Sequence, residues 1–233
     1  MFCIVLRGSR RRRDVEAEFS RVGLDVEIVE RERDEDGKRG CFESHQEVMR
    51  IALDRKLDSF VVFEDDVYFS ARSHSLTVKG IVEEAVALVS TNRSVVLGLG
   101  GLVVARVGRS VVEVSSVFRR TKFACTHAYV VSSSVAQEIA GWKYDGRHVD
   151  HVLMERYSEN MAMVVPSIAF QAGYFSGQEL TATDGSLWYK LLTVGRNVVS
   201  AFVVQVALET FFRAVGKLFP SQKLKTRSTD SHL

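Results

Sequence analysis

Three acidic residues in a row, Glu64, Asp65 and Asp66, follow the apolar run from Phe60 to Phe63 without a spacer. Such a run is typical of a strand that is buried on both faces. Three like charges at its end repel one another and lose solvation, so exposure on a loop or a divalent cation must relieve them. In open α/β sheets, ligands lie outside the carboxyl ends of the strands. The residues alone therefore leave two explanations open, a solvated strand end and a metal site that also holds phosphate.

Strands and helices are expected to alternate along the rest of the chain. A first helix is expected to be capped by Asp14 and ended by Gly23. The run 30–39 carries nine charges in ten positions and should form a solvated loop. The glycines at 98, 100 and 101 lack the spacing of a phosphate-binding loop, so we expect a tight turn that another strand or a donor sugar approaches closely. We expect strands at 2–6, 24–29, 60–63, 94–99, 125–131 and 161–165, helices at 15–22, 40–57, 75–89, 133–140 and 149–157, and a hairpin of 103–107 with 111–117. This alternation predicts a layered α/β fold.

Composition limits the class of protein. The 233 residues are enough for one large domain or two small ones, and with 46% hydrophobic and 26% charged residues a substantial core is available. The formal net charge of +2 gives no reason to expect nucleic acid as a partner. Cysteines at 3, 41 and 125 lack metal-type spacing and are odd in number, so they indicate a reducing, cytoplasmic setting without a disulfide framework. The pattern predicts neither a signal peptide nor a transmembrane segment.

Six short blocks occur in an order that resembles glycosyltransferase family 25. In the second block the Gly-Cys-Phe-x-Ser-His core, which ends at His45, is intact. Val5 and Gly8 depart from the usual residues of the first block. The blocks lie at 4–10, 37–45, 61–67, 126–132, 149–153 and 165–171, followed by Ser176. The family comprises bacterial lipopolysaccharide and lipooligosaccharide sugar transferases, with relatives that glycosylate collagen.

The resemblance implies a GT-A-like single domain over residues 1–186, with a mixed, mostly parallel central sheet flanked by helices. It also implies a nucleotide-sugar donor and a divalent cation, Mn²⁺ or Mg²⁺. Asp66 is the first expected metal ligand and Glu64 the second, because alternate residues of an extended segment share one face, whereas Asp65 would point the other way. Further residues that the resemblance implies in donor or cofactor binding are Glu64, Asp65, Arg7, Ser44, His45 and Gln171.

Two residues are candidates for the chemistry itself. Asp150 is the candidate general base, since a carboxylate near the acceptor can take the proton of the attacking hydroxyl. A helix N-cap is the structural alternative for Asp150. His127 lies in an apolar strand, where a histidine is usually a hydrogen-bonded core residue. The resemblance places His127 at the donor or acceptor site instead. The arginines from Arg10 to Arg13 could contact the diphosphate or form a solvated face.

The C-terminal part lies outside the family blocks. We expect a helical segment at 187–220 and a basic, disordered tail at 221–233. From Asn197 onward, polar residues recur every four positions and leave a wide apolar face. This face must be covered by the domain, by a second subunit in a homodimer or by lipid. Peripheral contact with the inner face of the membrane through 197–227 therefore stays open.

The leading hypothesis is a metal-dependent, inverting glycosyltransferase. It would move galactose or glucose from a UDP-sugar to a hydroxyl of a cell-envelope glycan. A nucleotidyltransferase is a second hypothesis, because such enzymes also pair acidic residues with Mg²⁺. A degenerate transferase fold that binds carbohydrate or partner proteins is the third. Release of free UDP or of pyrophosphate distinguishes the first two.

Overall fold

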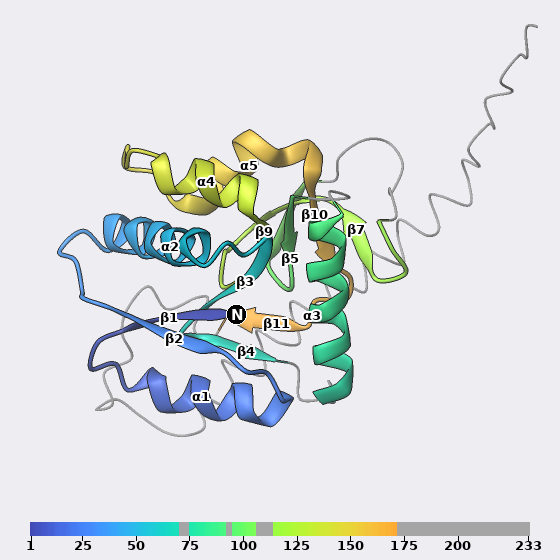
Figure 1. Ribbon diagram of the computed structural model, residues 1–233, viewed down its shortest axis with the longest axis horizontal. Helices are drawn as coiled ribbons and strands as arrows, with labels where there is room; N and C mark the ends of the chain where they lie inside the picture. The colour runs from blue at the N-terminus through green and yellow to red at the C-terminus, as the bar shows by residue number, and fades with distance from the viewer. Residues whose placement is uncertain (70–74, 92–94, 106–113, 172–233) are drawn as a thin grey trace, which may run out of the picture. The chain divides into compact units, whose positions relative to one another are not determined.

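A computed structural model describes residues 1–69, 75–91, 95–105 and 114–171 (Figure 1). Helices and strands alternate, as the sequence predicts. The strands are β1 (Phe2–Leu6), β2 (Glu27–Arg31), β3 (Ser59–Glu64), β4 (Val67–Phe69), β5 (Val96–Gly98), β6 (Leu102–Ala105), β7 (Phe118–Arg120), β8 (Lys122–Ala124), β9 (Ala128–Ser132), β10 (Met161–Val164) and β11 (Ala169–Gln171). The helices are α1 (Arg11–Val22), α2 (Gly37–Asp54), α3 (Ser75–Ser90), α4 (Ser133–Gly141) and α5 (Val149–Tyr157), and a 3₁₀ turn, η1 (Ser158–Asn160), follows α5.

Seven strands form the central sheet, in the order β2-β1-β3-β9-β5-β10-β7. The pairs β1–β2, β1–β3 and β5–β10 are parallel, whereas β9 runs antiparallel to both neighbours and β7 antiparallel to β10. Five strands therefore share one direction, and β9 and β7 are reversed. This arrangement confirms the predicted mixed, mostly parallel sheet. β4 pairs with β11 and β6 with β8 in two small additional sheets.

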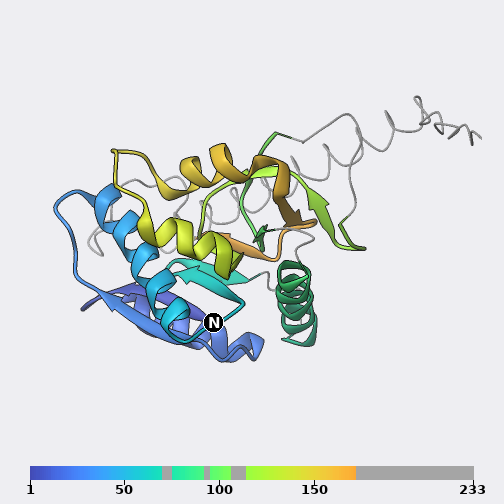
Figure 2. The ribbon, with the colours of Figure 1, turned by 45° about the horizontal axis from the view of Figure 1, so that its top comes forward.

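Helices cover both faces of the sheet (Figures 1 and 2). The strand β3 contributes side chains to the core on each side. Val61 and Phe63 belong to the hydrophobic cluster under α1 and α3. Phe60 and Val62 belong to the cluster under α2, α4 and α5. All four side chains are almost completely buried. The predicted burial of this strand on both faces is therefore confirmed, and its acidic end is fixed by the core behind it.

The first two helices begin earlier than the sequence predicted. α1 starts at Arg11, so Asp14 lies in its first turn and is not the cap. Gly23 does end α1, with a left-handed φ of 69°. α2 starts at Gly37 because the side chain of Asp36 accepts the backbone N–H groups of Lys38 and Arg39. The charged run 30–39 is therefore not one long loop: it ends one strand and begins one helix.

The predicted hairpin of 103–107 with 111–117 is wrong where the structure describes it. β6 pairs with β8, and residues 114–117 form bends before β7. The turn expected near Gly108 lies outside the described residues, as do Ser176, the helical segment 187–220 and the tail 221–233. The domain boundaries at 186 and 220 therefore stay predictions. Among the described helices, none is long and apolar enough to cross a membrane.

Candidate active site

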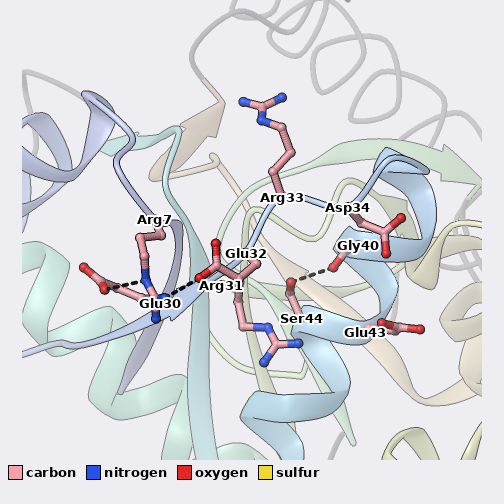
Figure 3. A pocket seen from close by; sticks show the side chains of 9 residues that line it. All are labelled: Arg7, Glu30, Arg31, Glu32, Arg33, Asp34, Gly40, Glu43 and Ser44. Atoms are coloured by element: carbon pink, nitrogen blue, oxygen red, sulfur yellow. Dashed lines mark hydrogen bonds and ion pairs between the residues drawn. The ribbon is translucent and has the colours of Figure 1, made fainter.

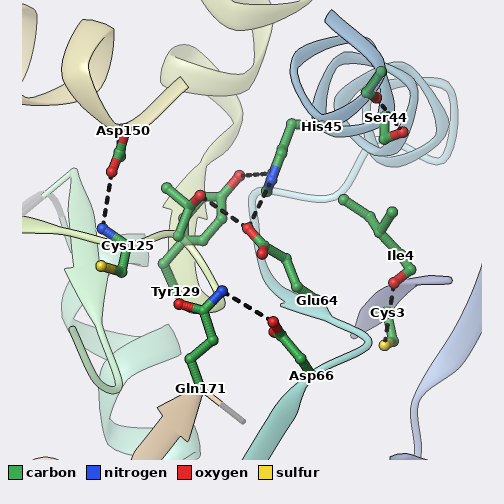
Figure 4. A network of polar contacts seen from close by, with 12 residues as sticks. Cys3, Ile4, Ser44, His45, Glu64, Asp66, Cys125, Tyr129, Asp150 and Gln171 are labelled. Atoms are coloured by element: carbon green, nitrogen blue, oxygen red, sulfur yellow. Dashed lines mark hydrogen bonds and ion pairs between the residues drawn. The ribbon is translucent and has the colours of Figure 1, made fainter. Parts of the chain in front are cut away.

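The acidic turn between β3 and β4 lies at the edge of the sheet where the parallel strands end (Figure 4). The segment that leads into the antiparallel strand β9 meets it there, since Glu64 N–H donates to His127 O at 3.0 Å. The loop after β1 meets it from the other side, with Ser9 Oγ 3.4 Å from Asp65 Oδ2. The topology therefore brings residues from distant parts of the chain to one edge of the sheet, where α/β folds bind ligands.

Glu64 is held by hydrogen-bonding side chains from α2 and from the residues before β9. Its Oε1 accepts from Thr126 Oγ1 at 3.0 Å and lies 3.2 Å from His45 Nε2. Burial alone would raise the pKa of Glu64, but the hydrogen bond from His45, the charge that His45 carries when it is protonated and the hydrogen bond from Thr126 lower it. The carboxylate of Glu64 is thus kept ionised and fixed in orientation.

Asp66 has few partners although its side chain is only 11% exposed. Gln171 Nε2 donates to Asp66 Oδ2 at 3.0 Å, and Arg11 Nη1 lies 3.8 Å from the same oxygen. The other oxygen, Oδ1, is buried and has no hydrogen-bond partner in the part of the chain that the structure describes. Burial and the charge of Glu64 raise the pKa of Asp66 to about 7, against the opposing effects of Gln171 and Arg11. Asp66 therefore lacks a positive partner that matches its burial.

Asp65 lies between the two and contacts α1. Its Oδ1 is 3.2 Å from Arg11 Nη1, the guanidinium nitrogen that also approaches Asp66. The premise that Glu64 and Asp66 share one face of an extended segment is wrong, because β3 ends at Glu64 and the next two residues form a turn. Asp65 and Asp66 consequently share the cation of Arg11, and Glu64 has partners of its own.

The acidic turn fits the divalent cation that the resemblance implies. An Asp66 oxygen that is buried and has no partner among the described residues leaves its negative charge insufficiently compensated, and the raised pKa of Asp66 agrees with this. Carboxylate oxygens are the ligands that Mg²⁺ and Mn²⁺ prefer. Asp66 would be the central ligand, with Asp65 or Glu64 as the second carboxylate.

Arg7 and Ser44 line a pocket of about 270 Å³ between the segment 30–34 and the start of α2 (Figure 3). Arg7 is paired with Glu30 at 3.6 Å and with Glu32, so its charge is already neutralised. Ser44 Oγ donates to Gly40 O of its own helix at 2.6 Å. The full lining comprises Arg7, Glu30, Arg31, Glu32, Arg33, Asp34, Gly40, Glu43 and Ser44. The predicted roles of Arg7 and Ser44 in donor binding stay predictions, in a pocket of mixed charge.

His127 is buried close to β11 and to a glycine turn. Burial lowers the pKa of His127 in spite of the nearby charge of Glu64, so the ring is neutral. Its Nε2 lies 3.3 Å from Ala169 O, whereas Nδ1 has no hydrogen-bond partner among the described residues. A Cβ atom at Gly100 would lie 1.8 Å from Ala169 O and 3.1 Å from His127 Nε2. The close approach of another strand that the sequence predicted at this turn is thus confirmed, and His127 adjoins the acidic edge.

Asp150 lies in the first turn of α5, but it is not the cap. The N-cap position belongs to His148. Asp150 Oδ2 accepts from the backbone N–H of Cys125 at 3.0 Å (Figure 4). Its Oδ1 accepts from the N–H of His151 at 2.8 Å. Cys125 has a left-handed φ of 75°, a conformation that needs support in a residue other than glycine. Asp150 therefore fixes the strained loop before β9, and its role as general base stays a prediction.

Thr126 and Tyr129 were not predicted as site residues, and Arg11 was named only as part of the run Arg10 to Arg13, which could contact the diphosphate or form a solvated face. Arg11 belongs to the basic run, whose contact with the acidic turn depends on the position of α1. Thr126 and Tyr129 belong to the fourth family block, and they contact Glu64 and His45. The blocks themselves were the available signal, since these pairs are separated by 62 and 84 positions.

The chain resembles several solved structures at low identity. The crystal structure of A197 from STIV aligns with 11% identity and a TM-score of 0.48, over 73% of this chain and 83% of that one. A glycosyltransferase involved in the glycosylation of the major capsid of PBCV-1 aligns with 12% identity and a TM-score of 0.41, over 67% and 75% of the two chains. HddC from Yersinia pseudotuberculosis gives 14% identity and a TM-score of 0.41, over 74% and 72%. At these values the likenesses carry no argument about activity.

No curated protein sequence matches the chain. The sequence does match the family described as glycosyltransferase family 25 (LPS biosynthesis protein), over residues 35–153. The match covers more than half of the 233 residues and includes α2, the acidic turn and Asp150. The chain therefore belongs to glycosyltransferase family 25, and the mixed sheet with its acidic edge is the GT-A-like domain of a glycosyltransferase.

Proposed function

We propose that this glycosyltransferase is metal-dependent and inverting, and that it transfers galactose or glucose from a UDP-sugar to a hydroxyl of a cell-envelope glycan. One observation carries the metal dependence: the largely buried Asp66 has an oxygen without a described partner and a pKa raised to about 7. The family description supports a lipopolysaccharide or related glycan as the acceptor. The cysteine content supports a cytoplasmic location, and membrane contact through 197–227 is part of the same proposal.

The residues of the acidic edge have separate roles in this proposal. Asp66 and one neighbouring carboxylate hold the cation, Mn²⁺ or Mg²⁺, which neutralises the leaving diphosphate when it is bound. Glu64 is kept ionised by His45 and Thr126, so it can bind the cation or a donor hydroxyl without rearranging. Gln171 holds Asp66 in place through its hydrogen bond.

Asp150 is the proposed general base. Each of its oxygens accepts one backbone N–H, and an ionised carboxylate oxygen can accept more than one hydrogen bond. The remaining lone pairs could take the proton of the acceptor hydroxyl as the new glycosidic bond forms. Direct displacement of this kind needs no nucleophile from the protein and inverts the configuration at the sugar carbon. His127, neutral and with a free Nδ1 lone pair among the described contacts, is the second proposed catalytic residue at this edge.

The test is a donor screen that measures free UDP. The purified full-length chain is incubated with UDP-galactose or UDP-glucose and with lipooligosaccharide that lacks its outer sugars, with Mn²⁺ or with EDTA. We expect acceptor-dependent UDP release that EDTA abolishes and that the Asp66→Asn protein lacks. Pyrophosphate as the product would favour a nucleotidyltransferase. Undiminished UDP release in EDTA would contradict the metal dependence, and a complete lack of turnover with every donor would favour a binding protein.

A further inference from the structure

A second group of possible metal ligands lies beside the acidic turn, on the α2 side. Cys41 and His45 are four residues apart on α2, so they share one face of the helix. Glu64 reaches them from the end of β3. One ligand atom from each, the thiol sulfur, a ring nitrogen and a carboxylate oxygen, lies within 4.8 Å of the other two. Within the residues that the structure describes, this is the one such group of three or more.

Hydrogen bonds orient two of these side chains, His45 and Glu64, in the way that metal ligands are usually oriented. His45 is fully buried, and its Nδ1 lies 2.8 Å from the hydroxyl oxygen of Tyr129. Histidines that bind metal ions generally have such a partner on the second ring nitrogen, which fixes the orientation of the ring. Glu64 is fixed in the same way by the Thr126 hydroxyl. The Nε2 atom of His45 and the carboxylate of Glu64 therefore face one another at 3.2 Å.

The group is also accessible. The Glu64 side chain is 22% exposed, and Cys41 is half-buried. A metal ion can therefore reach the ligands from solvent, and a water molecule can complete its coordination. Three protein ligands with one open position are characteristic of zinc sites that bind a further molecule.

The ligand chemistry differs from that of the acidic turn. Thiolate and imidazole favour Zn²⁺ and other borderline or soft ions, whereas carboxylates alone favour Mg²⁺ and Mn²⁺. We propose that Cys41, His45 and Glu64 form a zinc-binding site with an open fourth position, next to the carboxylates of Asp65 and Asp66. The zinc-site proposal does not depend on transferase activity, although the site shares Glu64 with the proposed Mn²⁺ ligands.

Binding has a definite proton balance. Burial raises the pKa of the Cys41 thiol, and the charges of Glu64, Asp150 and Asp66 add to this effect, so the free thiol is protonated. Zn²⁺ would displace the thiol proton to solvent. In the metal-free protein, His45 Nε2–H donates to the ionised Glu64, since a carboxylate can only accept. On binding, Nε2 would give up its proton and offer its lone pair to the metal, so that the one proton left on the ring would be on Nδ1, where it would donate to Tyr129 Oη.

Cobalt(II) is the probe, because it replaces Zn²⁺ at such sites and gives a thiolate-to-metal absorption band in the near ultraviolet. The full-length chain, with its thiols reduced, is titrated with Co²⁺, and Zn²⁺ is then added in competition. We expect one equivalent of Co²⁺ to give the band and Zn²⁺ to remove it. Cys41→Ser should abolish the band, whereas Cys125→Ser, at another half-buried cysteine, should retain it.

Two further variants keep the test decisive if Cys41→Ser folds poorly. Tyr129→Phe keeps the ring but removes the hydroxyl beside His45, so the band should persist while Co²⁺ affinity falls by about 10- to 100-fold. Replacing the exposed His148 and His151 by alanine removes another adjacent histidine pair and should change nothing. No band in the wild-type protein, or a band that survives Cys41→Ser, would overturn the proposal and leave the group as a hydrogen-bonded support for Glu64.

Discussion

The carboxylates on the two sides of the acidic turn differ in their hydrogen-bond partners and in the direction of their pKa shifts. On the side of α2 and β9, Glu64 is hydrogen bonded by His45 and Thr126, and its pKa is lowered. On the side of α1 and β11, Asp66 has an oxygen without a partner among the described residues, and its pKa is raised to about 7. The two residues are only two positions apart. The negative charge of Glu64 is therefore stabilised by groups of the protein itself, whereas the charge of Asp66 needs a bound cation.

The two carboxylates are also coupled. The charge of Glu64 is the second-largest cause of the raised pKa of Asp66, after burial. Each partner that keeps Glu64 ionised therefore makes ionisation of Asp66 less favourable without a cation. Arg11 compensates this repulsion in part, from α1. A divalent ion bound to Asp66 would relieve it more completely, and this is the physical basis of the proposed metal dependence.

Removing Asp66 should give the largest effect on turnover. Asp66→Ala should reduce glycosyl transfer by about 10³-fold or more, because it removes a ligand of the ion that stabilises the leaving group. The measurement is UDP release at saturating donor, together with thermal unfolding. Asp66→Asn, which keeps the shape and an acceptor for Gln171, is the matched control for packing and should be equally inactive. A folded Asp66→Ala protein with full activity would show that Asp66 is not a ligand.

Asp150→Asn should lower turnover by about 10²- to 10⁴-fold with little change in donor affinity, since asparagine cannot take a proton. Asparagine keeps an oxygen that can accept the N–H of Cys125, so thermal stability should stay near the wild-type value. Asp150→Ala loses this contact and should be less stable. Normal turnover in Asp150→Asn combined with low stability in Asp150→Ala would limit Asp150 to its support of the loop before β9.

The pH dependence of stability should separate the two carboxylates. The pKa of Asp66 is about 7 in the folded protein and about 4 when unfolded, so the folded state binds more protons between these values. The metal-free protein should therefore lose stability as pH rises from about 4 to 7, by up to about 4 kcal/mol from Asp66. Asp66→Asn should remove this component. Denaturant unfolding in EDTA across that range checks the difference, and identical slopes for the two proteins would contradict it.

Thr126→Val should have a smaller effect, on the opposite side of the turn. It removes a hydrogen bond to the ionised Glu64, which should cost about 1–2 kcal/mol of unfolding free energy at neutral pH. The pKa of Glu64 is lowered, so this stabilisation is present above the unfolded pKa and is lost as pH falls through the folded value. The cost should therefore shrink in acid. Thr126→Ser, which keeps the hydroxyl, is the control, and an equal loss there would indicate packing as the cause.

The sequence predicted the strand before the acidic turn, the bounds of α5 and the start of α4, because these depend on local patterns of apolar residues and caps. Ser132 does accept the N–H of Val135 at the start of α4. The pairing of β6 with β8 was missed, because it joins segments about 20 residues apart that no turn signal connects. The contrast between Glu64 and Asp66 was also beyond prediction, since it depends on which distant side chains reach each carboxylate.

The most direct test of this contrast is the binding of Mn²⁺ itself, followed by the electron paramagnetic resonance signal of the free ion. Wild-type protein, Asp66→Asn and Cys41→Ser are compared at neutral pH without donor. We predict that the wild type binds a single Mn²⁺, that Asp66→Asn weakens binding by about 100-fold or more, and that Cys41→Ser binds as the wild type does. Equal Mn²⁺ binding by the wild type and Asp66→Asn would contradict the assignment of Asp66 as the carboxylate that receives the metal.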